Sequence, residues 1–424
     1  MINRTIAPTF RQVEHVEILR ANPTKLDNGV PVFEISAGTQ ELVRIEFIFE
    51  NVGWNPEKPL QAYATNSLLQ EGTSAYTAAE LAEKLDYYGA FLQKDFSFDH
   101  SSVVLYTLNK HLATVLPLVK SMLTDAIFPQ HEIDTFVRNQ KQRLSVNLEK
   151  NDFLSRRLFS QTLFRDTLYG HASQPEEYDQ LKREDLLQYY QMAYQPSNCT
   201  LVVSGLVTPQ AHQLLNKEFG NSWDVGIHPH KNEFSFLPGR GQEHYIHKPE
   251  ALQSAIRIGQ LSINRSHPDF PAFQVLNTVL GGYFGSRLMA NIREDKGYTY
   301  GIGSALVSLQ NAGYFFIASE VGAEVCGAAI AEVEKEIKRL QTELVSPEEL
   351  SLVRNYMMGS MLGGLENAFS HADKFKNIYF FGLGYDYYDR YVQTLKNIKP
   401  EDILNLANQY LNFDQFEKVI VGNK

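Results

Sequence analysis

The chain repeats itself, and this internal duplication limits its fold more than any other feature of the sequence. The alternating stretch that begins at Val43-Arg44-Ile45 returns as Ile256-Arg257-Ile258, about half a chain length later. Val137-Arg138-Asn139 returns unchanged as Val353-Arg354-Asn355, and further matches keep the same order along both halves. The sequence therefore predicts a tandem duplication with one structural unit in each half.

Pro and Gly residues without apolar periodicity separate the two copies. We predict an N-terminal domain at residues 1–225, a linker at 226–239 and a C-terminal domain at 240–424. Each copy mixes alternating strand patterns with helical stretches, and the two patterns do not alternate regularly along the chain. This predicts an α+β fold of two homologous domains, each with a mainly antiparallel sheet covered by helices on one face.

Charge and composition exclude several classes of protein. The chain has 39 Lys and Arg against 49 Asp and Glu, a formal net charge of −10, which argues against a nucleic-acid partner. The chain contains no apolar run of about 18 residues, so the sequence predicts no membrane span. The start lacks a signal-peptide pattern, so we expect a cytoplasmic protein, with a periplasmic location left open if the start is trimmed. Cys199 and Cys326 lie in apolar surroundings and are expected to be buried thiols.

The second copy differs from the first at Arg293 and Tyr300. When the glycines of the two copies are aligned, Arg293 falls opposite Leu85 and Tyr300 opposite Leu92. A guanidinium and a phenol are well suited to donate hydrogen bonds to an amide carbonyl or an oxyanion. Gly297 suits the residue after a helix end, and the turn there could bring the two side chains together. The alternative is an arginine paired with a nearby carboxylate and a half-buried tyrosine.

A glycine-rich segment precedes this pair and contains Gly281, Gly282 and Gly285. Glycine-rich segments ahead of a helix can bind phosphates, but neither nucleotide-binding glycine motif is present. We predict a flexible or strongly bent connection here, acting as a hinge.

The sequence contains no complete catalytic motif. Zinc peptidases carry H-E-x-x-H or H-x-x-E-H on a helix, and neither occurs, nor does G-x-S-x-G. His228-Pro229-His230 is expected to be a solvated loop. A metal site built from scattered histidines such as His100 and His111 stays an alternative.

The duplication, the glycine-rich segment and the spacing of Arg293 and Tyr300 together resemble the insulinase/pitrilysin superfamily of zinc peptidases. The likeness is greatest to the half-length bacterial members related to mitochondrial processing peptidase. It extends from Leu26-Asp27-Asn28-Gly29-Val30 to Val419-Ile420-Val421-Gly422. The family's zinc motif, H-x-x-E-H-x-L-x-x-G-T, aligns with residues 63–73, where only its L-x-x-G-T end is kept. The two histidines, the glutamate and the distal glutamate ligand align with Tyr63, Ser67, Asn66 and Asn147.

The resemblance implies a division of labour between two chains. One subunit carries H-x-x-E-H, the zinc ion and the water-activating glutamate, and the other carries the Arg/Tyr pair that holds the substrate carbonyl. Two such chains close into a clamshell chamber, where an unfolded peptide adds as a strand to a sheet edge. This sequence resembles the second kind of subunit, so we expect no metal on this chain and no activity in its isolated form.

We therefore expect a non-zinc-binding subunit of a heterodimeric zinc metalloendopeptidase. Three alternatives stay open. The chain could be a scaffold without catalysis, like the core subunits of respiratory complexes, or a clamp that binds peptides without cleaving them. It could also form a homodimer in place of the heterodimer.

Overall fold

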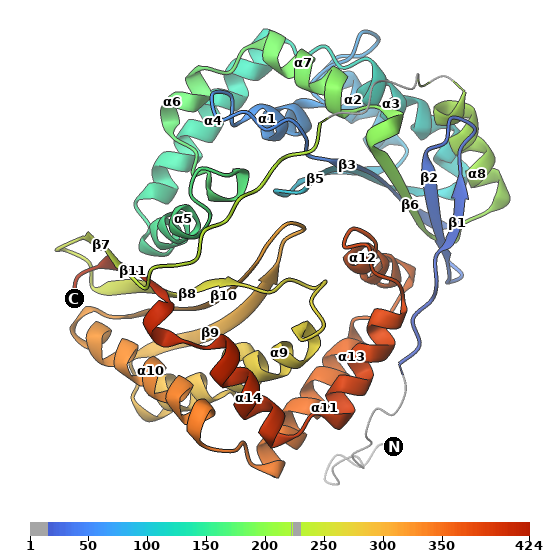
Figure 1. Cartoon of the computed structure of the whole chain (residues 1–424). Coiled ribbons are helices and arrows are strands. Elements are labelled where there is room, and N and C mark those ends of the chain that lie inside the picture. Colours follow the sequence, from blue (N-terminus) through green and yellow to red (C-terminus); the bar gives the residue numbers. More distant parts are fainter. Residues whose placement is uncertain (1–15, 222, 224–229) are drawn as a thin grey trace, which may run out of the picture.

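Figure 1 shows the computed structural model of the chain, which describes residues 16–221, 223 and 230–424. The start of the chain, residues 226–229 of the expected linker and His228-Pro229 lie outside the described residues. Among the helices that are described, none combines the length and the apolar character needed to cross a membrane.

A six-stranded sheet forms the core of the first half. Its strands run in the order β1-β2-β6-β3-β5-β4, and only the β2–β6 pair is parallel. The strands are β1 (Asn22–Lys25), β2 (Pro31–Ser36), β3 (Leu42–Glu50), β4 (Phe91–Phe96), β5 (His100–Leu108) and β6 (Cys199–Gly205). The helices are α1 (Gln61–Leu68), α2 (Ala78–Tyr87), α3 (Leu112–Thr124), α4 (Gln130–Leu148), α5 (Asn151–Phe164), α6 (Pro175–Asp179), α7 (Arg183–Ala193) and α8 (Pro209–Leu215).

The second half repeats this sheet. Its five strands run in the order β7-β11-β8-β10-β9, again with one parallel pair, β7–β11. The strands are β7 (Glu243–His247), β8 (Gln253–Ser262), β9 (Thr299–Ser308), β10 (Gly313–Gly322) and β11 (Glu417–Gly422). The helices are α9 (Phe270–Asn277), α10 (Cys326–Thr342), α11 (Pro347–Gly363), α12 (Ala368–Tyr379), α13 (Asp386–Asn397) and α14 (Pro400–Tyr410). The order matches β2-β6-β3-β5-β4 strand for strand, so the topology confirms the duplication and the α+β fold.

Strand β3 shows how the sequence produces the sheet. Its alternation places Val43, Ile45 and Phe47 on one face, where all three are fully buried in the helix-covered core of the first half. Burial of such side chains contributes about 1.5–3 kcal/mol each. Arg44 and Glu46 on the opposite face are also buried, with only 5% and 3% of their surface exposed. Two charged residues at such depth need partners, and the sequence neighbours of β3 do not provide enough of them.

Arg44 Nη2 and Glu46 Oε1 pair with each other at 2.8 Å, and the further charged partners of both residues come from α12 in the other half of the chain. Arg44 Nη2 donates to Asp373 Oδ1 at 3.0 Å, and Glu46 accepts a hydrogen bond from Lys376. Around these ion pairs, apolar side chains of α12 pack on the second face of the first sheet. They form one buried cluster with residues of β2, β3 and β6: Ile35, Ile48, Val202, Ala368, Ala372 and Phe375.

Helix α5 of the first half makes the reciprocal contact with the second sheet. Phe159 and Leu163 belong to one buried cluster with Val419 and Val421 of β11. In Figure 1, α5 and α12 lie on opposite sides between the two halves. We expected helices on only one face of each sheet. This expectation was incomplete, because a helix from the opposite half covers the second face of each sheet.

The chain that joins the halves packs against the first half. Asn232 Oδ1 accepts a hydrogen bond from the Trp54 backbone N–H at 2.8 Å. Phe234 stacks on Tyr169 with ring centroids 4.5 Å apart. Cys199 and Cys326 are free, buried thiols, as predicted. The proposed domain boundaries themselves stay a prediction.

Candidate functional site

Arg293 and Tyr300 lie together at the start of β9, an edge strand of the second sheet. Arg293 belongs to a π-helical segment, Met289–Asp295. Gly297 lies two residues after the end of this segment. It has a φ of +67°, a left-handed conformation that suits glycine and turns the chain into β9. The expected turn therefore forms, and Arg293 Nε donates to the Tyr300 carbonyl oxygen at 3.1 Å.

The guanidinium of Arg293 is held mainly by an aromatic ring. Its central carbon lies 4.7 Å from the centroid of Phe284, a cation–π distance. Glu294 Oε1 lies 3.7 Å from Arg293 Nη1, and the Glu294 side chain is half exposed, so this ion pair is weak. Among the described residues, none hydrogen-bonds the two terminal nitrogens of Arg293. The guanidinium therefore retains donors for a carbonyl group outside this chain.

Tyr300 is 93% exposed, so the half-buried tyrosine of the alternative interpretation is not found. It lies in a β-bulge, where Tyr300 and Gly301 of β9 face the single residue Glu320 of β10. Thr299 Oγ1 donates to the Glu320 carbonyl at 2.6 Å, and Ser319 Oγ donates to the Gly301 carbonyl at 2.9 Å. Bulges redirect side chains at strand ends, and sequence reasoning missed this one, although Gly301 inside a strand pattern was its signal.

The glycine-rich segment begins as a continuation of α9. Residues Thr278–Gly282 form a π-helical turn, and the chain becomes extended at Tyr283. A Cβ atom on Gly281 would lie 2.7 Å from the Ser304 backbone nitrogen, so glycine permits the close contact with β9. The sharp bend is present, and hinge motion at Gly282 or Gly285 stays a prediction.

Three of the four metal-motif positions lie on α1 and are joined to their surroundings by hydrogen bonds. The Tyr63 hydroxyl donates to Gln140 Oε1 at 3.1 Å, and Ser67 Oγ donates to the Tyr63 carbonyl at 2.8 Å. The Asn66 side chain, 1% exposed, donates to the Asp95 carbonyl at 2.8 Å and accepts from the Tyr194 hydroxyl at 3.0 Å.

The fourth position, Asn147, accepts a hydrogen bond from Lys150 Nζ at 2.9 Å. None of the four side chains is an imidazole, a thiolate or a carboxylate, which are the ligands that zinc takes in proteins. These residues therefore do not fit a zinc ion.

Tyr63 and Asn147 instead line one cavity of about 360 Å³. Arg143 and Arg157 contribute the charged groups of its wall, and no Asp or Glu is among the lining residues. Burial is the main cause that lowers the pKa of Arg157, with Glu177 opposing it. Two of the four aligned metal positions thus border a basic cavity, the opposite charge character from a cation site.

The alternative metal site at His100 and His111 does not form. His100 begins β5 and His111 follows its end, so the two are about 30 Å apart along the strand. Each ring contacts an aromatic neighbour instead, His100 on Phe380 and His111 on Tyr88. Within the described parts of the chain, no three His, Cys, Asp or Glu residues could hold a metal ion together.

Known proteins resemble this chain in sequence and in fold. Residues 180–357 match a family model described as the peptidase M16 inactive domain. An uncharacterized zinc protease of Rickettsia bellii is 24% identical over 417 residues, which are 95% of this chain and 98% of that protein. The non-peptidase homolog YmxG of Helicobacter pylori is 22% identical over 366 residues, 84% of this chain and 83% of its own.

Solved structures share the fold over nearly the whole chain. The peptidase M16 inactive domain from Pseudomonas fluorescens superimposes with a TM-score of 0.85 at 19% identity, covering 95% of this chain and 98% of its own. A protease from Helicobacter pylori gives 0.87 at 16% identity, with coverages of 96% and 100%. A chain of complex III2 from Candida albicans gives 0.77 at 13% identity, with coverages of 95% and 95%.

The fold is similar to that of the insulinase-like peptidases, and the four positions aligned with their metal motif carry no zinc-ligand side chain in this chain. More specifically, residues 180–357 match the family model of the peptidase M16 inactive domain, and this match confirms the resemblance predicted from the sequence.

Proposed function

We propose that this chain is the metal-free subunit of a two-chain zinc peptidase. In this proposal Arg293 and Tyr300 hold the substrate backbone for a partner chain that carries H-x-x-E-H. The observation that carries it is the contact of half-buried Arg293 with exposed Tyr300 at the start of an edge strand, in a chain whose metal positions do not fit zinc. Relatives named as zinc proteases and as a non-peptidase homolog support a role within a peptidase family.

The chemistry of this chain is binding and orientation. An extended peptide beside β9 would meet the free donors of the Arg293 guanidinium, which Phe284 and the Tyr300 carbonyl hold in place. The Tyr300 hydroxyl, presented by the bulge, would donate to the carbonyl that gains negative charge during attack. Zinc in the partner would polarise a carbonyl or activate water, which is the usual chemistry of that ion.

The test uses the chain purified in complex with an H-x-x-E-H homologue and assayed on an unfolded peptide. One preorganised donor is typically worth about 10²–10³ in rate. Arg293→Ala and Tyr300→Phe should each lower turnover by about that factor and leave the zinc content of the complex unchanged. Arg390→Ala and Tyr87→Phe, at exposed positions elsewhere, are the matched controls. Full turnover in both site variants would reject the assigned roles.

A scaffold or a peptide-binding clamp is the second candidate function. It is favoured by the hydrogen bonds of Tyr63, Asn66 and Ser67, which engage these three side chains with other residues of this chain. Assays of the chain alone and mixed with the H-x-x-E-H homologue separate the candidates. A peptidase subunit gives cleavage only in the mixture, a clamp binds peptide without cleavage, and a scaffold does neither.

A further inference from the structure

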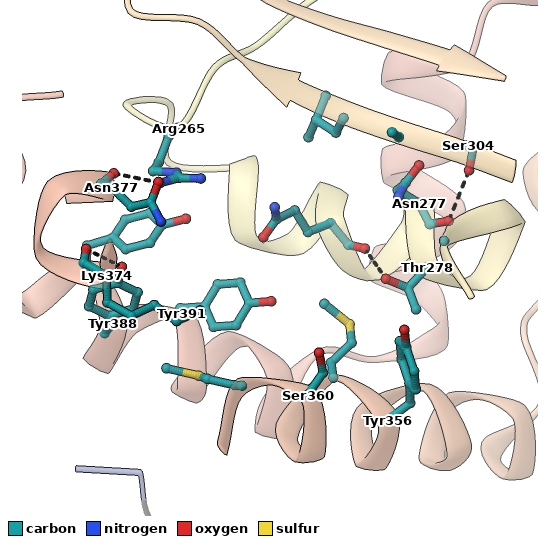
Figure 2. Close-up of a pocket in the computed structure, with 17 residues that line it drawn as sticks. Arg265, Asn277, Thr278, Ser304, Tyr356, Ser360, Lys374, Asn377, Tyr388 and Tyr391 are labelled. Atoms are coloured by element: carbon teal, nitrogen blue, oxygen red, sulfur yellow. Dashed lines mark hydrogen bonds between the residues drawn. The ribbon is translucent and has the colours of Figure 1, made fainter. Parts of the chain in front are cut away.

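A polar cavity of about 420 Å³ lies in the C-terminal half, bordered by α9, α11, α12, α13 and β9 (Figure 2). Neither Arg293, Tyr300 nor any of the four vacant metal positions lines it. We propose that this cavity binds a small hydroxylated organic anion, with a carboxylate or phosphate group held by Arg265 and Lys374.

The cavity contains two cations and no acid. Arg265 and Lys374 line one end, and none of the lining residues is Asp or Glu. Arg265 Nη1 donates to the Asn377 carbonyl at 2.6 Å, but its Nε is buried without a hydrogen-bond partner in the described chain. Because a buried donor without a partner is destabilising, an anionic oxygen at this place would be stabilising.

Lys374 adds the second charge. Its Nζ atom makes no hydrogen bond or ion pair with any described residue, whereas its neighbour on α12, Lys376, pairs with Glu46. Burial lowers the pKa of Lys374, the charge of Arg265 lowers it further, and Asp373 opposes both effects. Two cations that repel each other in a partly buried space favour a bound anion between them.

At the opposite end of the cavity, the unpaired polar atom is an acceptor, so a ligand there needs a hydrogen-bond donor. Asn277 lies there with Thr278 and Ser304, and its Oδ1 atom is buried without a partner among the described residues. Between the two ends, the Tyr391 side chain extends into the space (Figure 2). Burial raises the pKa of Tyr391, so this phenol stays protonated and can donate. The arrangement therefore matches a molecule with an anionic group at one end and a hydroxyl at the other.

The experiment measures binding to the full chain by isothermal titration calorimetry and by the change in Tm. Glycerate and glycerol 3-phosphate are the two probes, one for a carboxylate source and one for a phosphate source. Inorganic phosphate tests the anionic group alone, and glycerol tests the hydroxyl groups alone. We expect at least one of the two organic anions to bind at one site per chain and to raise Tm, and glycerol to have no effect.

Lys374→Gln should weaken that binding at least tenfold, while Lys338→Gln, an exposed lysine of α10, should leave it unchanged. Tyr391→Phe keeps the packing and should also weaken binding, which provides a second variant if Lys374→Gln unfolds the chain. The proposal is overturned if neither organic anion binds, or if both variants bind them as the wild type does. Equal affinity for inorganic phosphate and glycerol 3-phosphate would overturn the part that assigns the hydroxyl end.

Discussion

Asn66 occupies the position of the catalytic glutamate in the family motif, and both ends of its amide are in use. The amide nitrogen donates to the Asp95 carbonyl, and the amide oxygen accepts from the Tyr194 hydroxyl. A carboxylate can replace only the accepting half of this arrangement. Asn66 is thus part of the hydrogen-bonded core of the first half, and one substitution in this region would not create a metal centre.

The first prediction at this scale concerns Asn66→Asp. The variant would leave the Asp95 carbonyl without its donor and would bury a carboxylate beside it, so the free energy of unfolding should fall by about 1–3 kcal/mol. Urea denaturation at neutral pH measures the change. Asn412→Asp, at an exposed position, is the control and should be neutral. Equal stability of Asn66→Asp and the wild type would contradict the hydrogen-bond assignment.

Arg293 and Tyr300 could be found from the sequence because the duplication provides an internal comparison. The first copy has Leu85 and Leu92 at those positions, so the change from apolar to polar groups stands out. Phe284, which supports the guanidinium, could not be found in this way, because its contact with Arg293 depends on how the glycine-rich segment bends.

At the scale of elements, α12 makes contacts that join several parts of the molecule. It covers the first sheet with its apolar side, neutralises Arg44 and Glu46, and supplies Lys374 to the cavity of the second half. It also holds the start of the described chain, because the Leu19 backbone N–H donates to His371 Nδ1 at 3.2 Å.

This last contact predicts a dependence on pH. Burial lowers the pKa of His371 below its ordinary value of 6.5, with Glu17 opposing the shift. The neutral ring accepts at Nδ1 and the protonated ring cannot. Because the unfolded chain takes up the proton first, the stabilisation is fully present above pH 6.5 and is lost as pH falls through the folded-state pKa.

Hydrogen exchange at the Leu19 amide measures the effect. The protection of this amide should decrease between pH 7 and pH 5, and in His371→Asn the protection should no longer depend on pH over that range. His131→Asn is the control, since the His131 side chain is exposed and lies on another helix, α4. Protection that stays constant with pH in the wild type would contradict the prediction.

At the scale of the whole molecule, the two halves stabilise each other by exchange. Each sheet is closed on one side by the helices of its own half and on the other by a helix that the opposite half supplies. A polar contact links the halves as well, where the Tyr169 hydroxyl meets Asp99 and accepts from Asn311 Nδ2 at 3.2 Å. The two halves of the sequence thus pack against each other as one unit in space.

We therefore predict that residues 1–225 and 226–424, expressed separately, will not fold. Without its counterpart, each half exposes the apolar surface of α5 or α12 and of the sheet face beneath the missing helix. The stabilisation that is lost is proportional to the apolar area that becomes exposed. Co-expression should give a soluble one-to-one complex, observed by size-exclusion chromatography. The intact chain with a protease site inserted within 226–229 is the control and should stay assembled after cleavage. Either half folding alone as a monomer with cooperative unfolding would contradict the prediction.

Local sequence patterns determined a great deal about this protein. Period-two alternation in β3 and β8, the repeated order of motifs and the residues aligned with the metal motif predicted the duplicated α+β fold and the absence of zinc ligands. These features depend on neighbouring residues or on direct alignment of the two copies, so no knowledge of the tertiary structure is needed to read them.

Only the tertiary structure decided what lies on the second face of each sheet, how Tyr300 is presented, and where the cavities of about 420 Å³ and 360 Å³ form. Arg44 and Asp373 are far apart in the sequence, and the charge of Arg44 gives no sign of which distant helix will neutralise it. Hydrophobic burial has no direction, so a sequence shows that a surface must be covered but not by which element. That choice is made when the chain folds back on itself.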